Sequence, residues 1–219
     1  MITQLNQALW FPDPREAERG DYDGLVAVGG DLSVESLLLA YRTGIFPWSA
    51  RPITWWSPDP RGIFELDRVH VPRSLARVLR RNPFRVTRDE AFAEVIKSCA
   101  TVPRDDRTWI TSELVAAYIR LHQAGHAHSV ECWQGDELVG GIYGVAVGGL
   151  FAGESMFHRA DNASKIALMH LVEHLRARNF GLFDIQMLTP TTQQLGALEI
   201  PRSDYLVRLA HAVALAVHF

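Results

Sequence analysis

Two polar side chains, Asp184 and Gln186, stand two positions apart in a predicted buried strand over residues 182–187. Alternate side chains of a strand share a face, so both are expected on one surface, with Ile185 on the other. A carboxylate beside an amide could hold an attacking amine and stabilise the positive charge that develops on it, as acyl transfer to an amine requires. The alternative is a polar, solvated sheet face.

A second carboxylate follows a long glycine-rich apolar strand, in the segment Gly153-Glu-Ser-Met-Phe. Glycines in a strand allow another backbone or a ligand to approach closely. Glu154 could bind a cationic group or a ribose hydroxyl, or it could simply be a cap or turn residue. A serine nucleophile at Ser155 is not favoured, because the closing glycine of the Gly-x-Ser-x-Gly pattern is missing.

Positive charge is concentrated in one segment. The chain has a formal net charge of −3, but residues 68–88 contain seven arginines and no acidic residue, which leaves −10 for the rest. Helical spacing there predicts a helix opening near Ser74 with four arginines on one side: Arg73, Arg77, Arg80 and Arg81. Guanidinium groups match phosphate oxygens, so this face could bind a nucleic-acid backbone. The alternative is an ordinary solvated helix face.

Histidines and tryptophans give weaker signals. His122, His126 and His128, with Glu131, are residue types that bind metal ions. They straddle a predicted helix end, a glycine and a strand, so no regular element presents them together and no metal site is expected. Trp48 and Trp109 lie near predicted loop ends and could stack on an unpaired base, although core packing is the usual role of such residues.

Composition restricts the class of protein. The 219 residues are 47% hydrophobic and 21% charged, a balance typical of one domain or two small ones and not of disordered or fibrous chains. The longest uncharged apolar run, residues 138–153, is too short to span a bilayer and contains six glycines. The N-terminal residues lack the features of a secretory signal, so a cytosolic protein without a membrane partner is expected. Cys99 and Cys132 are expected to be reduced and structural.

The elements that must position these residues change character along the chain. Residues 1 to about 60 are rich in Gly, Pro and Trp and predict a small loop-rich domain with one clear helix, 34–43, between Ser33 and Gly44. Beyond them the pattern predicts helices at 90–99, 112–123, 164–178 and 203–217, a strand at 84–87, a hairpin of 128–133 and 137–144 continued by 145–153, and the strand 182–187. This order indicates an α+β fold.

Nine motifs in series resemble the leucyl/phenylalanyl-tRNA–protein transferase family. They are Gly24-Leu-Val-Ala-Val-Gly-Gly-Asp-Leu-Ser, Ala40-Tyr-Arg-Thr-Gly-Ile-Phe-Pro-Trp, Trp55-Trp-Ser-Pro-Asp-Pro-Arg, Thr108-Trp-Ile, His126-Ala-His-Ser-Val-Glu, Leu138-Val-Gly-Gly-Ile-Tyr-Gly, Gly153-Glu-Ser-Met-Phe, Asn162-Ala-Ser-Lys and Leu195-Gly-Ala. The resemblance covers nearly the whole chain in order.

The resemblance implies a fold and an activity. The fold would be a small N-terminal domain, residues 1–63, followed by a domain that resembles the GCN5-type acetyltransferase fold, residues 64–219. The activity would be transfer of Leu or Phe, and some Met, from aminoacyl-tRNA to the α-amine of proteins that begin with Arg or Lys, which marks them for N-degron degradation. No cofactor and no metal would take part, and the enzyme would be a cytoplasmic monomer.

The resemblance also implies roles for individual residues. Gln186 would contact the attacking amine with support from Asp184, and Glu154 would contact substrate. Trp48 and Trp109 would hold the aminoacyl-adenosine end. The pocket for the transferred side chain would include five residues: Ile142, Met156, Leu171, Leu175 and Phe183. The four arginines of the predicted helix, Arg73, Arg77, Arg80 and Arg81, would hold the tRNA acceptor stem by its phosphates.

The chain departs from the family pattern at three places. Ile185 replaces a common Cys, Gln194 replaces a common Ser, and leucines stand at 171 and 175 where aromatic residues can occur, which would leave more room for Phe. Two other functions stay open at this stage. One is a coenzyme-A-dependent N-acetyltransferase, against which the segment 178–183 argues because it lacks the small residue that ends a pyrophosphate turn. The other is a tRNA-binding module without activity.

Overall fold

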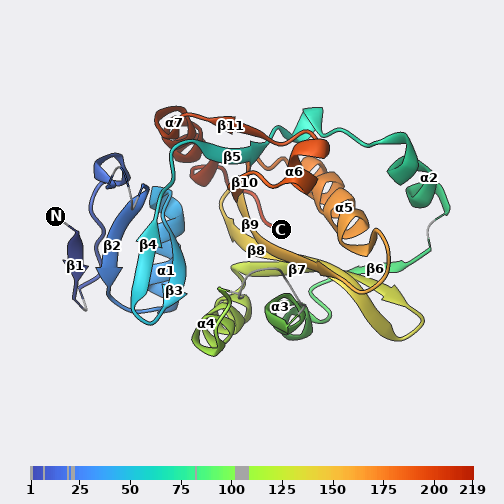
Figure 1. The fold of residues 1–219 in the computed structure, drawn as a ribbon, viewed down its shortest axis with the longest axis horizontal. Helices are drawn as coiled ribbons and strands as arrows, with labels where there is room; N and C mark the ends of the chain where they lie inside the picture. Colours follow the sequence, from blue (N-terminus) through green and yellow to red (C-terminus); the bar gives the residue numbers. More distant parts are fainter. Residues whose placement is uncertain (1, 7, 19, 21–22, 82, 102–108) are drawn as a thin grey trace.

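A computed structural model describes residues 2–6, 8–18, 20, 23–81, 83–101 and 109–219 (Figure 1). Thr108, which begins one of the quoted motifs, lies outside this range. The described helices are α1 (Val34–Thr43), α2 (Arg73–Arg81), α3 (Phe92–Thr101), α4 (Ser112–Gln123), α5 (Ala163–Ala177), α6 (Pro190–Gln194) and α7 (Arg202–Val213). The described strands are β1 (Thr3–Leu5), β2 (Leu25–Gly29), β3 (Phe46–Ala50), β4 (Ile53–Trp56), β5 (Arg61–Phe64), β6 (Arg85–Arg88), β7 (Ala127–Gln134), β8 (Glu137–Val147), β9 (Leu150–His158), β10 (Leu182–Gln186) and β11 (Leu198–Ile200).

The first part of the chain contains more regular structure than the sequence predicts. Its strands form a four-stranded sheet in the order β1-β2-β4-β3. The strands are only three to five residues long, and Pro47 within β3 has no N–H to donate, so they leave a weak sequence pattern. Helix α1 begins and ends where predicted, because the Ser33 hydroxyl caps its first turn and Gly44 follows its last with φ of 85°.

The second sheet has seven strands in the order β11-β5-β10-β9-β8-β7-β6. Neighbouring strands are antiparallel except β9 and β10, which are parallel and are joined through α5. The predicted domain boundary between residues 63 and 64 falls inside β5, which belongs wholly to this sheet. The break between the two sheets therefore lies between Trp56 and Arg61.

Helices cover both faces of the large sheet, which confirms the predicted mixed α+β class. Helix α5 lies on one face, and α3 and α4 lie on the other (Figure 1). Alternate residues of β8 supply the two cores: Ile142 packs with α5, and Tyr143 packs with α3 and α4. No helix in the described part of the chain is long and apolar enough to cross a bilayer.

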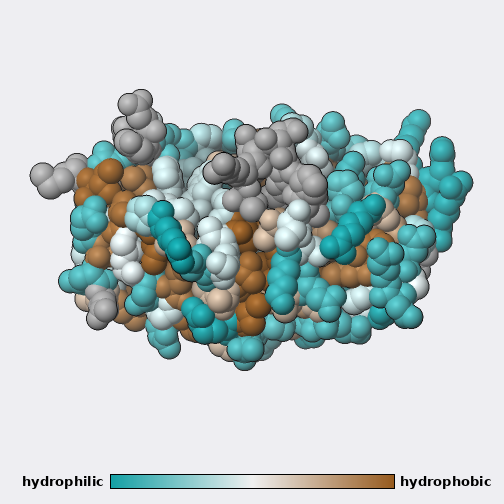
Figure 2. All heavy atoms as spheres, turned by 60° about the horizontal axis from the view of Figure 1, so that its bottom comes forward, coloured by the Kyte–Doolittle hydropathy of each residue, from teal (hydrophilic) through white to brown (hydrophobic). Residues whose placement is uncertain are grey.

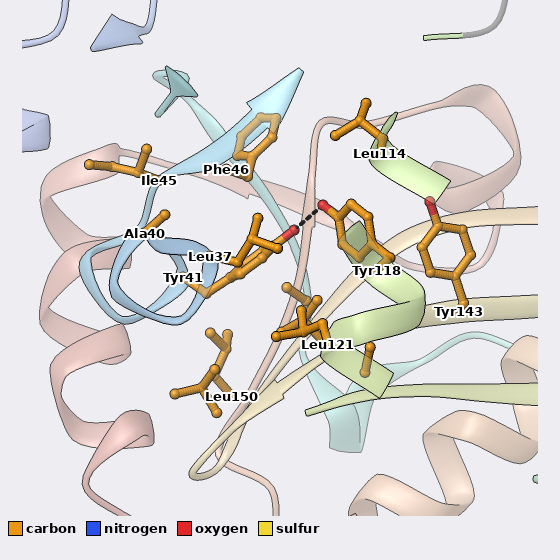
Figure 3. Packing of buried hydrophobic residues seen from close by; sticks show 14 of the residues in the cluster. Leu37, Ala40, Tyr41, Ile45, Phe46, Leu114, Tyr118, Leu121, Tyr143 and Leu150 are labelled. Atoms are coloured by element: carbon orange, nitrogen blue, oxygen red, sulfur yellow. Dashed lines mark hydrogen bonds between the residues drawn. The ribbon is translucent and has the colours of Figure 1, made fainter. Parts of the chain in front are cut away.

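One core joins the two sheets. Leu37, Ala40 and Tyr41 of α1 pack toward Tyr118 and Leu121 of α4, as Figure 3 shows. All five are buried, so α1 is held against the larger sheet by apolar contact. Residues from the first sheet can therefore meet residues from the second at fixed positions.

The hairpin β8–β9 turns later than predicted. Strand β8 continues to Val147, the chain turns at Gly148 and Gly149, and β9 pairs with β8 as far as His158. Gly148 has φ of 55°, which suits the turn. Glu154 therefore lies within a strand and not after one, at the point where the pairing of β9 with β8 shifts register between Gly153 and Ser155.

Candidate active site

A cavity of about 360 Å³ lies between the two sheets. Its wall is made by residues of β3, β5, β8, β9, α5, β10 and α6 and of the segments before α4 and after β10: Phe46, Pro47, Trp48, Phe64, Trp109, Ile142, Gly153, Glu154, Ser155, Met156, Leu168, Ile185, Gln186, Met187, Leu188, Thr189 and Thr192. Most of these side chains are apolar. Among the described lining residues, Glu154 is the only one with an ionisable side chain, so the electrostatics of the cavity centre on it.

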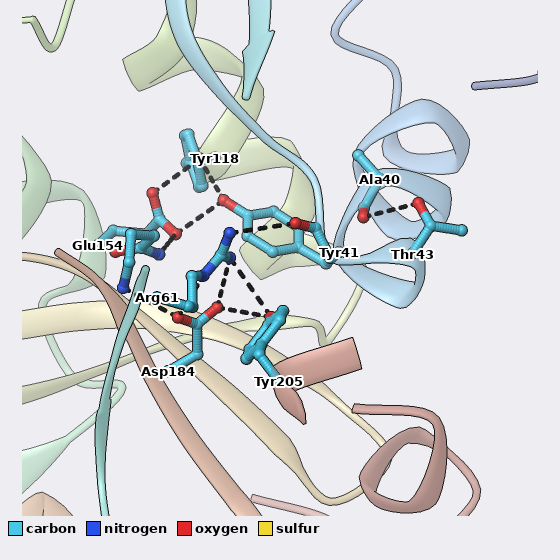
Figure 4. Close-up of polar contacts among 10 residues, drawn as sticks. Ala40, Tyr41, Thr43, Arg61, Tyr118, Glu154, Asp184 and Tyr205 are labelled. Atoms are coloured by element: carbon cyan, nitrogen blue, oxygen red, sulfur yellow. Dashed lines mark hydrogen bonds and ion pairs between the residues drawn. The ribbon is translucent and has the colours of Figure 1, made fainter. Parts of the chain in front are cut away.

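Three neutral donors bind the Glu154 carboxylate (Figure 4). The Tyr41 hydroxyl donates to Oε1 at 2.8 Å, the Tyr118 hydroxyl donates to Oε2 at 3.0 Å, and the Gln186 amide Nε2 donates to Oε1 at 3.1 Å. Burial raises the pKa of Glu154 to about 7, although the two tyrosine hydroxyls act to lower it. Burial also raises the pKa of both phenols well above the usual value, so they remain protonated donors.

Gln186 reaches the cavity because strand β10 is irregular. Its backbone has φ of 60°, in the left-handed region that side chains seldom adopt, and the pairing with β5 shifts between Asp184 and Gln186. A Cβ at Gly62 would lie 2.9 Å from the backbone carbon of Met187, so glycine there allows β5 to approach this irregular end. The predicted alternation is wrong here: Ile185 and Met187 line the same cavity as Gln186.

Asp184 lies behind the wall in a backing layer with Arg61 and Tyr205 (Figure 4). Arg61 donates from Nε to Oδ1 at 2.9 Å and from Nη2 to Oδ2 at 2.7 Å, and the Tyr205 hydroxyl donates to Oδ2 at 2.8 Å. The backbone N–H of Gln186 donates to Oδ1 at 2.9 Å. Both charged side chains are only 1% exposed, so Asp184 cannot touch a molecule in the cavity and instead holds the backbone of Gln186.

Arg61 also links the backing layer to the first sheet. Its Nη1 donates to the carbonyl oxygen of Gly44 at 3.1 Å, and its guanidinium lies over the rings of Phe46 and Tyr205. Gly44 ends α1 and Phe46 begins β3, which also carries Trp48. The ion pair thus fixes the strand that forms one side of the cavity relative to Gln186 on the other.

The structure brings together some of the residues that the sequence singled out and not others. Glu154, Gln186, Trp48, Trp109, Ile142 and Met156 all line the cavity. Leu171, Leu175 and Phe183 do not: each is fully buried in the core between α5 and the sheet. The residue of α5 that reaches the cavity is Leu168, nearly one turn before Leu171, because the helix faces the cavity only near its N-terminal half.

Four residues of the site were missed. Tyr41 and Tyr118 bind Glu154, and Arg61 and Tyr205 bind Asp184. Tyr41 and Arg61 do occur in quoted motifs, so a buried role could have been suspected for them. Tyr118 and Tyr205 lie on helices among other core residues, and no spacing rule distinguishes a tyrosine that donates to a carboxylate from one that only packs.

The predicted arginine helix is present as α2. Leu75 is buried, Val78 and Leu79 are half-buried, and the four arginines 73, 77, 80 and 81 are all exposed. None of the four is in an ion pair with another residue of the described part. Figure 2 shows hydrophilic residues gathered at the end of the molecule where α2 lies, which is on the right in both views.

His122, His128 and Glu131 each form hydrogen bonds with other groups of the protein. His122 Nδ1 lies 2.8 Å from the carbonyl oxygen of Ala127, and His128 Nδ1 lies 2.8 Å from Asp89 Oδ2. Glu131 is fully buried and accepts hydrogen bonds from two hydroxyls. Within the described residues, no group of three His, Cys, Asp or Glu side chains is arranged to hold a metal ion.

Comparison with known proteins gives a consistent result over almost the entire chain. The family model described as "Leucyl/phenylalanyl-tRNA protein transferase" matches residues 63–210, and the model of that family's N-terminal domain matches residues 30–59. The leucyl/phenylalanyl-tRNA–protein transferase of Pseudomonas syringae pv. syringae (strain B728a) is 54% identical over an alignment of 216 positions that covers 95% of this chain and 93% of that protein. The protein of the same name from Syntrophobacter fumaroxidans is 53% identical over an alignment of 221 positions that covers 99% of this chain and 93% of that protein.

Proposed function

The chain belongs to the leucyl/phenylalanyl-tRNA protein transferase family, and we propose that it moves Leu or Phe, and some Met, to the α-amine of proteins that begin with Arg or Lys. Members of this family are aminoacyltransferases that use tRNA as donor and protein as acceptor. The observation that carries this proposal is the cavity, whose wall combines a mostly apolar surface with one carboxylate and one amide. The apolar surface suits the transferred side chain, and the polar pair suits an amine.

The donor end would occupy the apolar side of the cavity. Ile142, Met156 and Leu168 offer contacts to a Leu, Phe or Met side chain, whereas Trp48 and Trp109 offer flat surfaces for the terminal adenosine. An apolar pocket discriminates between side chains by about 1–3 kcal/mol per methylene-sized difference, so the preference would be graded. The ester bond to the ribose is already activated, and positioning supplies much of the remaining catalysis.

The acceptor would approach Glu154 and Gln186. The carboxylate attracts a cationic amine, and the Gln186 side chain orients it toward the ester carbonyl. Asp184 supports Gln186 through the backbone hydrogen bond and does not contact substrate itself. It is a positioning residue in this proposal, which refines the catalytic pair expected from the sequence.

Three further parts of the proposal concern tRNA binding, the fold of the second domain and the role of the enzyme in the cell. The exposed arginines of α2 would hold the tRNA acceptor stem by its phosphates. The parallel pair β9 and β10 within an otherwise antiparallel sheet supports a GCN5-type fold for the second domain. The enzyme would act as a cytoplasmic monomer and mark its products for N-degron degradation.

The test is transfer of labelled Leu from charged tRNA to a peptide that begins with Arg. Wild type is expected to form the labelled peptide, and Gln186→Ala is expected to lose about 10²-fold in rate, as removal of one preorganised hydrogen-bonding group does. Gln193→Ala, an exposed glutamine on α6, is the matched control. Transfer of labelled acetyl groups from acetyl-coenzyme A, or tRNA binding without any product, would overturn the proposal.

A further inference from the structure

The proposed transfer requires the acceptor α-amine to lose a proton, and the residue roles proposed for it include no group that accepts this proton. The α-amine of a protein has a pKa of about 7.7–8.0, so it arrives mostly as an ammonium ion at neutral pH. An ammonium nitrogen has no lone pair with which to attack an ester carbonyl. A group in contact with the cavity must therefore accept one proton before the C–N bond can form.

Two polar residues near the amine are poorly suited to this task. The amide of Gln186 is not protonated at neutral pH and can only orient the amine. Asp184 is 1% exposed, and Arg61, Tyr205 and the Gln186 N–H occupy its oxygens. A proton from the acceptor could reach Asp184 only by displacing a buried ion pair, which is strongly unfavourable because it leaves the Arg61 cation buried without its partner.

Glu154 has the position that the task requires. It is the one ionisable side chain among the described residues of the cavity wall, and it is partly exposed there. Its oxygens are bound by two hydroxyls and one amide, all neutral, so no cation holds it permanently in the charged form. Its Oε1 accepts a hydrogen bond from the Gln186 amide, the group that would orient the amine. An amine held by Gln186 would therefore also lie next to Glu154.

We propose, on the basis of the transfer proposed above, that Glu154 is the general base of the reaction. Its carboxylate takes a proton from the acceptor α-ammonium and becomes a carboxylic acid. The neutral nitrogen then attacks the ester carbonyl carbon, a C–N bond forms and the C–O bond to the ribose breaks. The second nitrogen proton passes to the departing ribose oxygen, and Glu154 releases its proton to solvent when the product leaves. Each turnover thus yields the peptide bond, uncharged tRNA and one proton.

The surroundings of Glu154 suit a proton that must be both taken and released. The groups that face it are Tyr41 on α1, Tyr118 on α4, Asp184 on β10 and Arg61 on β5. The two phenols stay neutral, and Asp184 and Arg61 have opposite charges that act on Glu154 in opposite directions. The resulting pKa of about 7 lies within about one unit of that of the amine, which is the match that general base catalysis favours.

Glu154→Gln provides the main test, because it keeps the size of the side chain and removes the base. Transfer of Leu to the Arg peptide is measured from pH 6.5 to 8.5 for wild type and variant. We expect a loss of about 10²-fold at pH 6.5 that narrows at least tenfold by pH 8.5, where more of the amine is already neutral. With an aminooxy-terminated peptide, a much weaker base that arrives unprotonated, the two enzymes should differ by less than about threefold.

A loss of equal size at every pH and on both nucleophiles would overturn the proposal, since it would mean that Glu154 only positions substrate. An unchanged rate would overturn it too. Glu113→Gln, on the surface of α4, is the matched control and should behave as wild type. If wild type itself transfers no Leu, the proposed function fails, and that result is distinct from the failure of Glu154 as base.

Tyr118→Phe gives a second test that does not require the Gln variant to fold. It removes one hydrogen bond from the Glu154 carboxylate, so the anion is less stable and the acid limb of the pH–rate profile should move to higher pH. Thermal unfolding and tRNA binding verify that each variant is folded. An acid limb that stays in place in a folded Tyr118→Phe enzyme would contradict the assignment.

Discussion

Glu154 lies on the wall of the cavity, and Asp184 lies in the backing layer behind it. The two carboxylates are joined by one residue, Gln186, whose side chain donates to Glu154 and whose backbone donates to Asp184. Asp184 is bound by the cation of Arg61, whereas Glu154 is bound only by neutral donors. The same chemical group is therefore suited to structural support in one region and to proton transfer in the other, because partners and exposure set the role.

The leucines of α5 repeat this contrast. Leu168 faces the cavity, and Leu171 lies in the core behind it, less than one turn away. Both are fully or almost fully buried, so burial alone does not separate a wall residue from a backing residue. What separates them is whether the opposite side of the side chain meets the cavity or other side chains.

Breaking the ion pair in the backing layer should give the largest effect. Arg61→Met leaves Asp184 buried without its cation, and we expect a loss of about 3–5 kcal/mol in the free energy of unfolding, measured with urea. Arg208→Met is the control, because its pair with Glu65 is at the surface and should contribute less than about 1 kcal/mol. The double variant Arg61→Met with Asp184→Leu should recover part of the loss. A single variant as stable as the control would show that the buried pair contributes no more to stability than a surface pair does.

Removing the wall carboxylate, Glu154, should have the opposite effect: it should raise the free energy of unfolding relative to wild type as the pH rises, whereas breaking the buried ion pair lowers it. The pKa of Glu154 is raised from 4.5 to about 7 in the folded protein, so folding favours the protonated form. Its stabilising contribution is complete below pH 4.5 and is lost as the pH rises toward 7. Relative to wild type, Glu154→Gln should therefore gain about 1–3 kcal/mol of unfolding free energy between pH 5 and pH 8.

Urea denaturation at both pH values checks this expectation. Glu113→Gln is the matched control, because that carboxylate is at the surface and its backbone hydrogen bonding lowers its pKa. The control should show no gain with rising pH. If the unfolding free energy of Glu154→Gln changed with pH in the same way as that of wild type, Glu154 would titrate at the same pH in the folded and unfolded chains.

The sequence predicted the elements of this site better than the contacts within it. Helix α1 and its caps, the arginine face of α2 and the β7–β8 hairpin all follow from local patterns. The bulge at Gln186 does not, because it depends on the pairing of β10 with β5, more than 100 residues away. The Arg61–Asp184 pair, 123 residues apart in sequence, likewise exists only in the folded chain. Residue types showed which chemistry was available, and tertiary contacts decided which carboxylate reaches the cavity.

The leucine pair offers a smaller, selective effect. Leu168→Ala enlarges the cavity, so the ratio of kcat/KM for Phe to that for Leu should rise about tenfold, within the range for a pocket that changes by a few methylenes. Leu171→Ala should lose about 2–5 kcal/mol of stability and leave the ratio within about twofold. Competition between Leu-tRNA and Phe-tRNA measures the ratio directly. A change of more than about twofold in this ratio in the Leu171 variant would indicate that Leu171 lines the pocket, as the sequence predicts.

The smallest effect is expected outside both layers, on α2. Arg77→Gln removes one exposed charge, so tRNA affinity should fall a few-fold and the slope of log K against log salt should decrease by about one. The rate at saturating tRNA should not change, because α2 contributes no residue to the cavity wall. Arg15→Gln, an exposed arginine that is already paired with Asp13, is the control and should leave the slope unaltered. A lower rate at saturation with an unchanged slope would mean that Arg77 acts on the cavity and not on the phosphates, and the wall would then have to include α2.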